Sequence, residues 1–193
     1  MLRNGGKMEF RELLETSPVI AAAKDEEGLK RALETDCGIV FTLYGNLCTV
    51  EGMVKRIREA GKMAVVHMDL IQGLGGREIA VDFLKDSAGA QGVISTKIAL
   101  VRRAMELGMA GIWRTFLVDS IALNNTKKQL SAAAPDAVEI LPGILPRIIR
   151  EIRSCTGVPI IAGGLLSDKK DVLEALDAGA WAVSSTREEL WKL

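Results

Sequence analysis

Aromatic residues are scarce in this chain, and it contains no long apolar run. Only 4% of its 193 residues are aromatic, whereas 48% are hydrophobic, so the core must be built from aliphatic side chains and alanine. No apolar run approaches the roughly 18 residues that a helix needs to cross a bilayer. Residues 1–17 also lack the apolar region of a signal peptide. We therefore expect a cytoplasmic protein with no membrane partner.

A net charge is missing as well. Lysine and arginine together number 25, and aspartate and glutamate also number 25. A nucleic-acid-binding protein usually carries a basic excess, although a local basic patch can occur on a neutral protein. Bulk charge therefore gives no sign of a nucleic-acid partner.

Metal-binding and disulfide patterns are not found. Cys37, Cys48 and Cys155 are odd in number and widely spaced, and they form neither a CxxC motif nor a cluster with histidine. Only His67 and Asp69 pair as possible ligands, and two ligands are too few for a facial metal site. We expect no metal and no cofactor.

Strand-like apolar runs do occur, and they alternate with amphipathic helical segments. The eight strand-like runs begin at Val19, Gly38, Met63, Gln91, Gly111, Ala137, Pro159 and Ala180. The helical segments between them begin at Asp25, Val50, Arg77, Lys97, Ser120, Pro146 and Asp168, and residues 187–193 have room for about two turns. Strict alternation of this kind indicates a parallel sheet with right-handed crossovers.

The fold class that follows is α/β, with eight units in one domain. We predict a (β/α)8 TIM-type barrel with short loops over residues 18–193, preceded by an N-terminal extension at residues 1–17. An open doubly wound parallel sheet is the alternative, because a sequence pattern does not show whether the sheet closes.

Polar residues interrupt the predicted strands near their carboxyl ends, where a barrel carries its chemistry. His67 and Asp69 are two apart, so in a strand they point the same way as Val65. His67 is the only histidine. It is either a hydrogen-bonded core residue or a functional one, since a polar pair on an apolar strand needs a partner.

Arg114 and Glu139 interrupt the fifth and sixth runs. Charges in buried strands are costly unless they are paired, and neighbouring strands make these two residues a natural ion pair inside the barrel mouth. That pair is either purely structural, or Arg114 reaches an anionic ligand and Glu139 orients the arginine or a ligand hydroxyl.

The stretch "PIIAGGLLSDKKDV" raises a further alternative. Gly163 and Gly164 end an apolar run, and Ser167 and Asp168 can cap the helix that follows, so the segment is either a tight turn or an anion cradle. The loops after strands 7 and 8 of such barrels often bind phosphate. We predict a phosphate site with these members: Gly163, Gly164, Ser184, Ser185 and Thr186. Lys24 and Lys97 follow strands at the same mouth.

Two catalytic signatures are not present. No lysine lies inside a predicted strand, which disfavours a Schiff-base aldolase, and no GxSxG hydrolase motif occurs.

Several strand-end motifs together resemble one family. They are "VHMDLIQGL", "GVISTK", "IWRTFLVDS", "VEILPGILP" and "PIIAGGLLSDKKDV" with the final "LWK". In these motifs the chain resembles the glycerol-3-phosphate-responsive antiterminators of glycerol uptake operons, from about Pro18 to the C-terminus. The resemblance implies a TIM-barrel-like regulator that senses glycerol 3-phosphate and acts on the leader mRNA of glycerol-catabolism operons. It implies a binding protein rather than an enzyme.

The resemblance also implies a ligand pocket. Its expected lining is His67, Asp69, Arg114, Glu139, Pro142 and Gly143, together with the glycine and serine turns. The chain departs from the family pattern at Lys24 and Lys97, where arginine is frequent, and at Arg187, where asparagine is common. Arginine and lysine are not equivalent at a phosphate contact, so ligand affinity or identity could differ.

The RNA partner follows from the resemblance alone, since no RNA-binding motif is found. Basic clusters on the helical segments are typical of solvated faces, and the best alternative is the set of Arg147, Arg150 and Arg153. Two other functions stay open. One is an enzyme acting on a small phosphorylated metabolite with His67 as acid or base and Asp69 or Glu139 as its partner. The other is a barrel that only binds phosphate.

Overall fold

Eight parallel strands close into a barrel in the computed structural model, which describes residues 5–193 and the side chains of residues 9–193. Each strand pairs with the next along the chain, and the last pairs with the first. The strands are β1 (Val19–Ala23), β2 (Ile39–Thr42), β3 (Met63–His67), β4 (Gly92–Ser95), β5 (Ala110–Phe116), β6 (Ala137–Leu141), β7 (Ile160–Gly163) and β8 (Ala182–Ser185). The predicted barrel is confirmed, and the open-sheet alternative is wrong.

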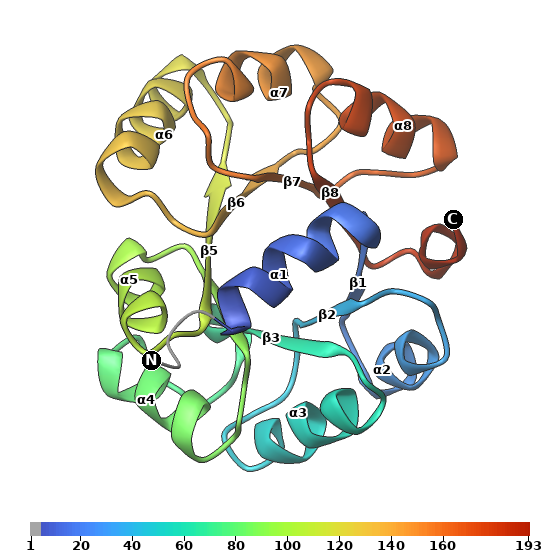
Figure 1. Ribbon diagram of the computed structural model, residues 1–193, viewed down its shortest axis with the longest axis vertical. Coiled ribbons are helices and arrows are strands. Elements are labelled where there is room, and N and C mark those ends of the chain that lie inside the picture. The colour runs from blue at the N-terminus through green and yellow to red at the C-terminus, as the bar shows by residue number, and fades with distance from the viewer. Residues whose placement is uncertain (1–4) are drawn as a thin grey trace.

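Helices surround the barrel and connect consecutive strands (Figure 1). They are α2 (Glu26–Leu33), α3 (Val50–Glu59), α4 (Glu78–Asp86), α5 (Ile98–Glu106), α6 (Ser120–Ala133), α7 (Pro146–Arg153) and α8 (Lys169–Asp177). Two 3-10 helices, η1 (Met68–Leu70) and η2 (Glu188–Lys192), follow β3 and β8. Of the described helices, none is long and apolar enough to cross a membrane. The three cysteines form no disulfide.

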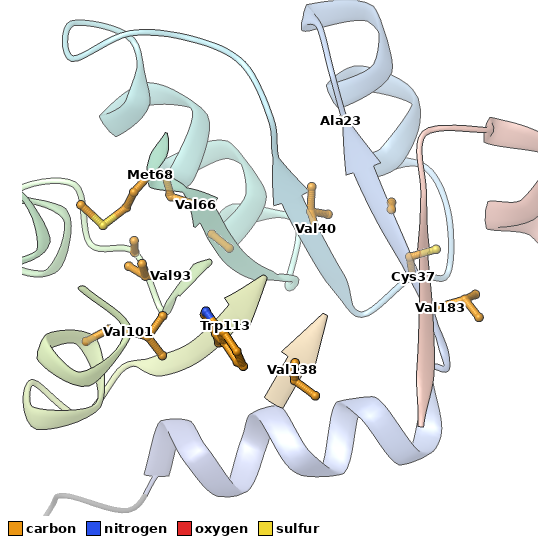
Figure 2. Packing of buried hydrophobic residues seen from close by; sticks show 14 of the residues in the cluster. Ala23, Cys37, Val40, Val66, Met68, Val93, Val101, Trp113, Val138 and Val183 are labelled. Atoms are coloured by element: carbon orange, nitrogen blue, oxygen red, sulfur yellow. The ribbon is translucent and has the colours of Figure 1, made fainter. Parts of the chain in front are cut away.

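Buried side chains form two layers, because successive strand residues point to opposite faces. On β2, Val40 faces the helices while Phe41 faces the barrel interior. The outer layer joins strands and helices, and Figure 2 shows members of it, including Val40, Val66 and Val93. The inner layer holds small residues such as Ala110 and Ala182 beside larger ones.

The N-terminal extension contains a helix that the sequence analysis did not predict. Helix α1 (Gly5–Thr16) lies across one end of the barrel (Figure 1). Its Phe10 and Leu14 are buried in the interior layer, and the Arg11 guanidinium lies 4.6 Å from the centre of the Trp181 ring. This helix therefore closes the amino-terminal end of the barrel and leaves the carboxyl end as the mouth.

Candidate functional site

The barrel interior changes from apolar to polar at the carboxyl ends of the strands. Each inward-facing row begins with apolar residues of the interior layer, such as Val65 on β3 and Ile112 on β5. Two residues further along, the same rows carry His67 on β3, Arg114 on β5, Glu139 on β6 and Ser184 on β8. The period of two that builds the core thus also brings four polar side chains to the mouth.

An ion pair between Arg114 and Glu139 forms the centre of this polar layer. The two residues are direct partners across β5 and β6, and Nε of Arg114 donates a hydrogen bond to Oε2 of Glu139. The hydroxyl of Ser184 donates to Oε1 of the same carboxylate at 2.5 Å. Because Glu139 is fully buried, both of its oxygens need such partners. The predicted ion pair is confirmed.

Gly163 makes room for this network. A Cβ atom at Gly163 would come within 2.8 Å of both Oε1 of Glu139 and the Ser184 hydroxyl oxygen. No real side chain fits there, so the glycine lets a carboxylate from β6 meet a hydroxyl from β8 across β7. Gly163 was predicted as a phosphate-binding residue, and its part in this network becomes visible only in the barrel geometry.

His67 is buried under the mouth, with 2% of its surface exposed. Burial, followed by the charge of Arg114, lowers the pKa of His67 to about 4, so the ring is neutral near pH 7. Within the described part of the chain, its Nδ1 atom has no hydrogen-bond partner.

Asp69 lies beyond the end of β3, so the strand alternation on which its predicted direction rested does not reach it. Strand β3 ends at His67, and η1 turns Asp69 toward the loop after β4. Its carboxylate accepts hydrogen bonds from the Ser95 hydroxyl at 2.9 Å, the Thr96 amide at 2.7 Å and the Thr96 hydroxyl at 3.0 Å. The alternation of a strand no longer applies once the chain turns into a 3-10 helix.

A pocket of about 380 Å³ opens above the ion pair. Six of the predicted ligand or phosphate residues line it: Arg114, Glu139, Gly164, Ser184, Ser185 and Thr186. The lining also includes Arg187, Leu43, Leu141 and Leu165, which were not among the predicted site residues. Arg187 directly follows the predicted phosphate loop in sequence, and this adjacency was the available signal.

The other predicted ligand residues do not line this pocket. Lys24 and Lys97 are exposed, and the Lys97 ammonium lies against Gly76 in the loop before α4. Gly143 supports the end of β7, since its amide donates to the Gly163 carbonyl at 2.6 Å. Pro142, beside it, is partly buried. His67, Asp69 and Gly163 also do not line the pocket.

The N-terminus of α8 is capped by the Asp168 side chain. Asp168 accepts from the Asp171 amide at 3.0 Å, and Asp171 accepts from both the amide and the hydroxyl of Ser167 at 2.7 Å. These carboxylates also place negative charge at this helix terminus, which helix dipoles favour. The capping role expected of Asp168 is confirmed.

Comparison with known proteins decides the family. Residues 19–191 match the model of the glycerol-3-phosphate responsive antiterminators. The chain belongs to this family. The family is one of transcription regulators, so the resemblance seen in the strand-end motifs is confirmed.

Individual relatives cover almost the whole chain. The uncharacterized protein YgcP of Escherichia coli (strain K12) is 41% identical over 186 residues, which are 96% of this chain and 97% of YgcP. A glycerol uptake operon antiterminator regulatory protein from Listeria monocytogenes has a TM-score of 0.87 at 31% identity, over 91% of this chain and 95% of its own. An antiterminator-related protein from Thermotoga maritima has a TM-score of 0.82 at 31% identity, over 92% and 99%.

Membership of a regulator family favours the binding protein over the enzyme. The fold does not discriminate, because it is shared with enzymes such as an orotidine 5'-phosphate decarboxylase, at a TM-score of 0.65 and 21% identity. His67 also suits acid–base chemistry poorly, since its pKa of about 4 is far from neutral pH. Among the described residues, no group of three or more potential ligands could hold a metal ion.

Proposed function

We propose that this antiterminator binds glycerol 3-phosphate at the mouth of its barrel and, in response, controls the binding of leader mRNA from glycerol-catabolism operons. The single observation that carries the ligand site is the pocket of about 380 Å³ over a polar floor. Its loops after β7 and β8 are those with which such barrels often hold phosphate. The family supports the ligand, because its members are described as responsive to glycerol 3-phosphate.

The polar floor suits the glycerol part of this ligand. The carboxylate of Glu139 has two bonded oxygens, but each carboxylate oxygen can accept more than one hydrogen bond. A ligand hydroxyl above the floor can therefore donate to Glu139 without breaking the ion pair. His67, Asp69, Pro142 and Gly143 would act from below or beside the pocket by holding this floor in place.

Thermal unfolding with added ligand tests the ligand assignment. Glycerol 3-phosphate at 100-fold over its Kd should stabilise the fold by about 2.7 kcal/mol, or raise the Tm by about 5–10 °C for a domain of this size. Glycerol and inorganic phosphate, at equal concentration, are the controls. Equal shifts for all three compounds would overturn glycerol 3-phosphate as the specific effector.

We propose that the leader RNA binds to the exposed surface of helix α7. Most other basic clusters have acidic partners: Arg56 pairs with Glu26, and Arg103 pairs with Asp82. On α7, Arg147, Arg150 and Arg153 are exposed and form no ion pair within the described part of the chain. Such arginines are available to contact phosphates.

Fluorescence anisotropy with labelled leader RNA tests this surface. Wild-type protein should bind the RNA more tightly when glycerol 3-phosphate is present. The double variant Arg147→Glu and Arg150→Glu should lose RNA binding while keeping its thermal shift with the ligand. RNA binding that survives charge reversal would show that α7 is not the contact.

A further inference from the structure

The loops after β4 and β8 are two copies of one structure. Their sequences are Ser95, Thr96, Lys97 and Ser185, Thr186, Arg187. In each loop the first serine hydroxyl accepts a hydrogen bond from the third residue's amide, at 3.0 Å in the first loop and 3.1 Å in the second. The two loops therefore present the same set of donors.

The strands that carry these loops pair in the same register. His67 of β3 lies opposite Ile94, directly before Ser95, and Gly163 of β7 lies opposite Ser184, directly before Ser185. Counting two residues beyond His67 reaches Asp69, and counting two beyond Gly163 reaches Leu165. The β7 and β8 pair thus matches the β3 and β4 pair in register, but the chain after Gly163 is left-handed at Gly164 and Leu165, whereas the chain after His67 forms η1.

The first loop already binds an anion, the carboxylate of Asp69. The Thr96 amide and the Thr96 hydroxyl both donate to Oδ2 of Asp69, at 2.7 and 3.0 Å. These hydrogen bonds, with the one from Ser95, lower the pKa of Asp69 against the opposing effect of burial, so the bound group is a carboxylate anion at neutral pH. This loop structure is therefore an anion-binding structure in this same chain.

The second loop has the donors but not the anion. By residue count Leu165 corresponds to Asp69, but it has a left-handed φ of 64°, and 72% of its surface is exposed. The amide and hydroxyl of Thr186 have no acceptor among residues 9–193. Both Leu165 and Thr186 line the mouth pocket, so an acceptor can reach this loop from solvent.

Arg187 supplies the charge that this loop needs. Of the cations predicted around the mouth, only Arg114 lines the pocket, and Glu139 already neutralises it. Arg187 also lines the pocket and forms no ion pair with any residue that the structure describes. Its neighbour Glu188 is engaged with Arg31. The unpaired positive charge at the pocket therefore belongs to Arg187.

We infer that Thr186 and Arg187 bind the anionic group of the ligand, as the equivalent loop binds the carboxylate of Asp69. The Thr186 amide and hydroxyl donate two hydrogen bonds, and the Arg187 guanidinium is the counter-ion. The ligand class is a phosphate monoester of a small polyol, with its phosphate at the rim and its hydroxyls toward Glu139; its identity as glycerol 3-phosphate rests on the proposed function. The N-terminus of α8 takes no part, because Asp168 and Asp171 occupy it.

Amide chemical shifts test the site directly. The ¹⁵N-labelled full chain is titrated with inorganic phosphate and, separately, with glycerol 3-phosphate. The Thr186 amide should shift with both, and glycerol 3-phosphate should saturate it at the lower concentration. If glycerol 3-phosphate binds and shifts other amides but not Thr186, the loop is not the anion site while the proposed function stands. If Thr186 shifts but glycerol 3-phosphate binds no more tightly than phosphate, the loop stands and the proposed function fails. No shift with either compound would overturn both.

Variants give the second test. Thr186→Val and Arg187→Gln, both at exposed positions, should each weaken glycerol 3-phosphate binding by at least about tenfold, because each removes a charge-assisted contact. Arg102→Gln, at an exposed position on α5, is the control for net charge and should keep the wild-type Kd. An unchanged Kd in both test variants would overturn the inference.

Discussion

At the scale of single residues, Glu139 is the buried carboxylate at the centre of the polar layer in the barrel mouth. It is fully buried and accepts hydrogen bonds from Arg114 and Ser184. A buried ion pair contributes little net stability when intact, because desolvation offsets the attraction. Removing one partner is different, since the remaining charge is then buried alone.

We expect Glu139→Ala to lower the free energy of unfolding by about 3–5 kcal/mol, because Arg114 loses its counter-ion. The double variant Arg114→Met and Glu139→Met should lose much less of its free energy of unfolding, because no charge is left unpaired. Urea denaturation of the two variants and the wild type measures this. A double variant as unstable as Glu139→Ala would contradict the explanation.

His67 makes stability depend on pH. Burial and the charge of Arg114 lower its pKa from 6.5 to about 4 in the folded chain, whereas Asp69 acts in the opposite direction. Between pH 6.5 and about pH 4, His67 is protonated in the unfolded chain but stays neutral in the folded chain. The free energy of unfolding should therefore fall as pH decreases from 6.5 to 4, by on the order of 3 kcal/mol in total.

The variant His67→Gln isolates this contribution, because it removes the titrating ring. Urea denaturation between about pH 7 and pH 4.5 should show a shallower fall for the variant than for the wild type. Equal slopes would mean that His67 titrates normally in the folded protein.

At the scale of elements, α1 closes the amino-terminal end of the barrel. Phe10 and Leu14 enter the interior layer beside residues such as Ile39 and Met63. The other face of the helix, including Glu12, is exposed. Its burial pattern is that of an amphipathic cap on the barrel.

We expect Phe10→Ala to lower the free energy of unfolding by about 3–5 kcal/mol, because apolar contacts are lost and a cavity remains. Glu12→Ala on the exposed face should change stability by less than about 0.5 kcal/mol. Chemical denaturation of both variants provides the comparison. If the two variants unfold alike, α1 packs only loosely on the barrel.

The elements also show where sequence patterns stop being informative. Alternation gave His67 the direction of Val65, and the cost of a buried charge predicted the pair of Arg114 and Glu139; these residues all lie within regular strands. Asp69 lies beyond the end of β3, so strand alternation does not apply to it. Helix α1 was missed because its segment does not follow a strand in the repeating order.

At the scale of the whole molecule, the proposed regulation has a thermodynamic consequence. If glycerol 3-phosphate raises RNA affinity, then leader RNA must raise the affinity for glycerol 3-phosphate by the same factor. A tenfold effect corresponds to about 1.4 kcal/mol of coupling.

We expect isothermal titration of the protein with glycerol 3-phosphate to give a lower Kd when leader RNA is saturating. RNA of scrambled sequence is the control and should leave the Kd unchanged. Unequal coupling factors in the two directions would show that the RNA and the ligand are not linked through one protein equilibrium.

The sequence by itself determined the eight strand and helix units, the ion pair between Arg114 and Glu139, and the family. These follow from local periodicity, from the cost of a buried charge and from motifs that are continuous in the chain. Only the tertiary structure decided that the sheet closes and that Gly163 makes room for a carboxylate from one neighbouring strand to reach a hydroxyl on the other. It alone brought Leu165 and Arg187 into one pocket. These are relations between residues far apart in the chain, and they exist only once the strands have fixed their register around a closed barrel.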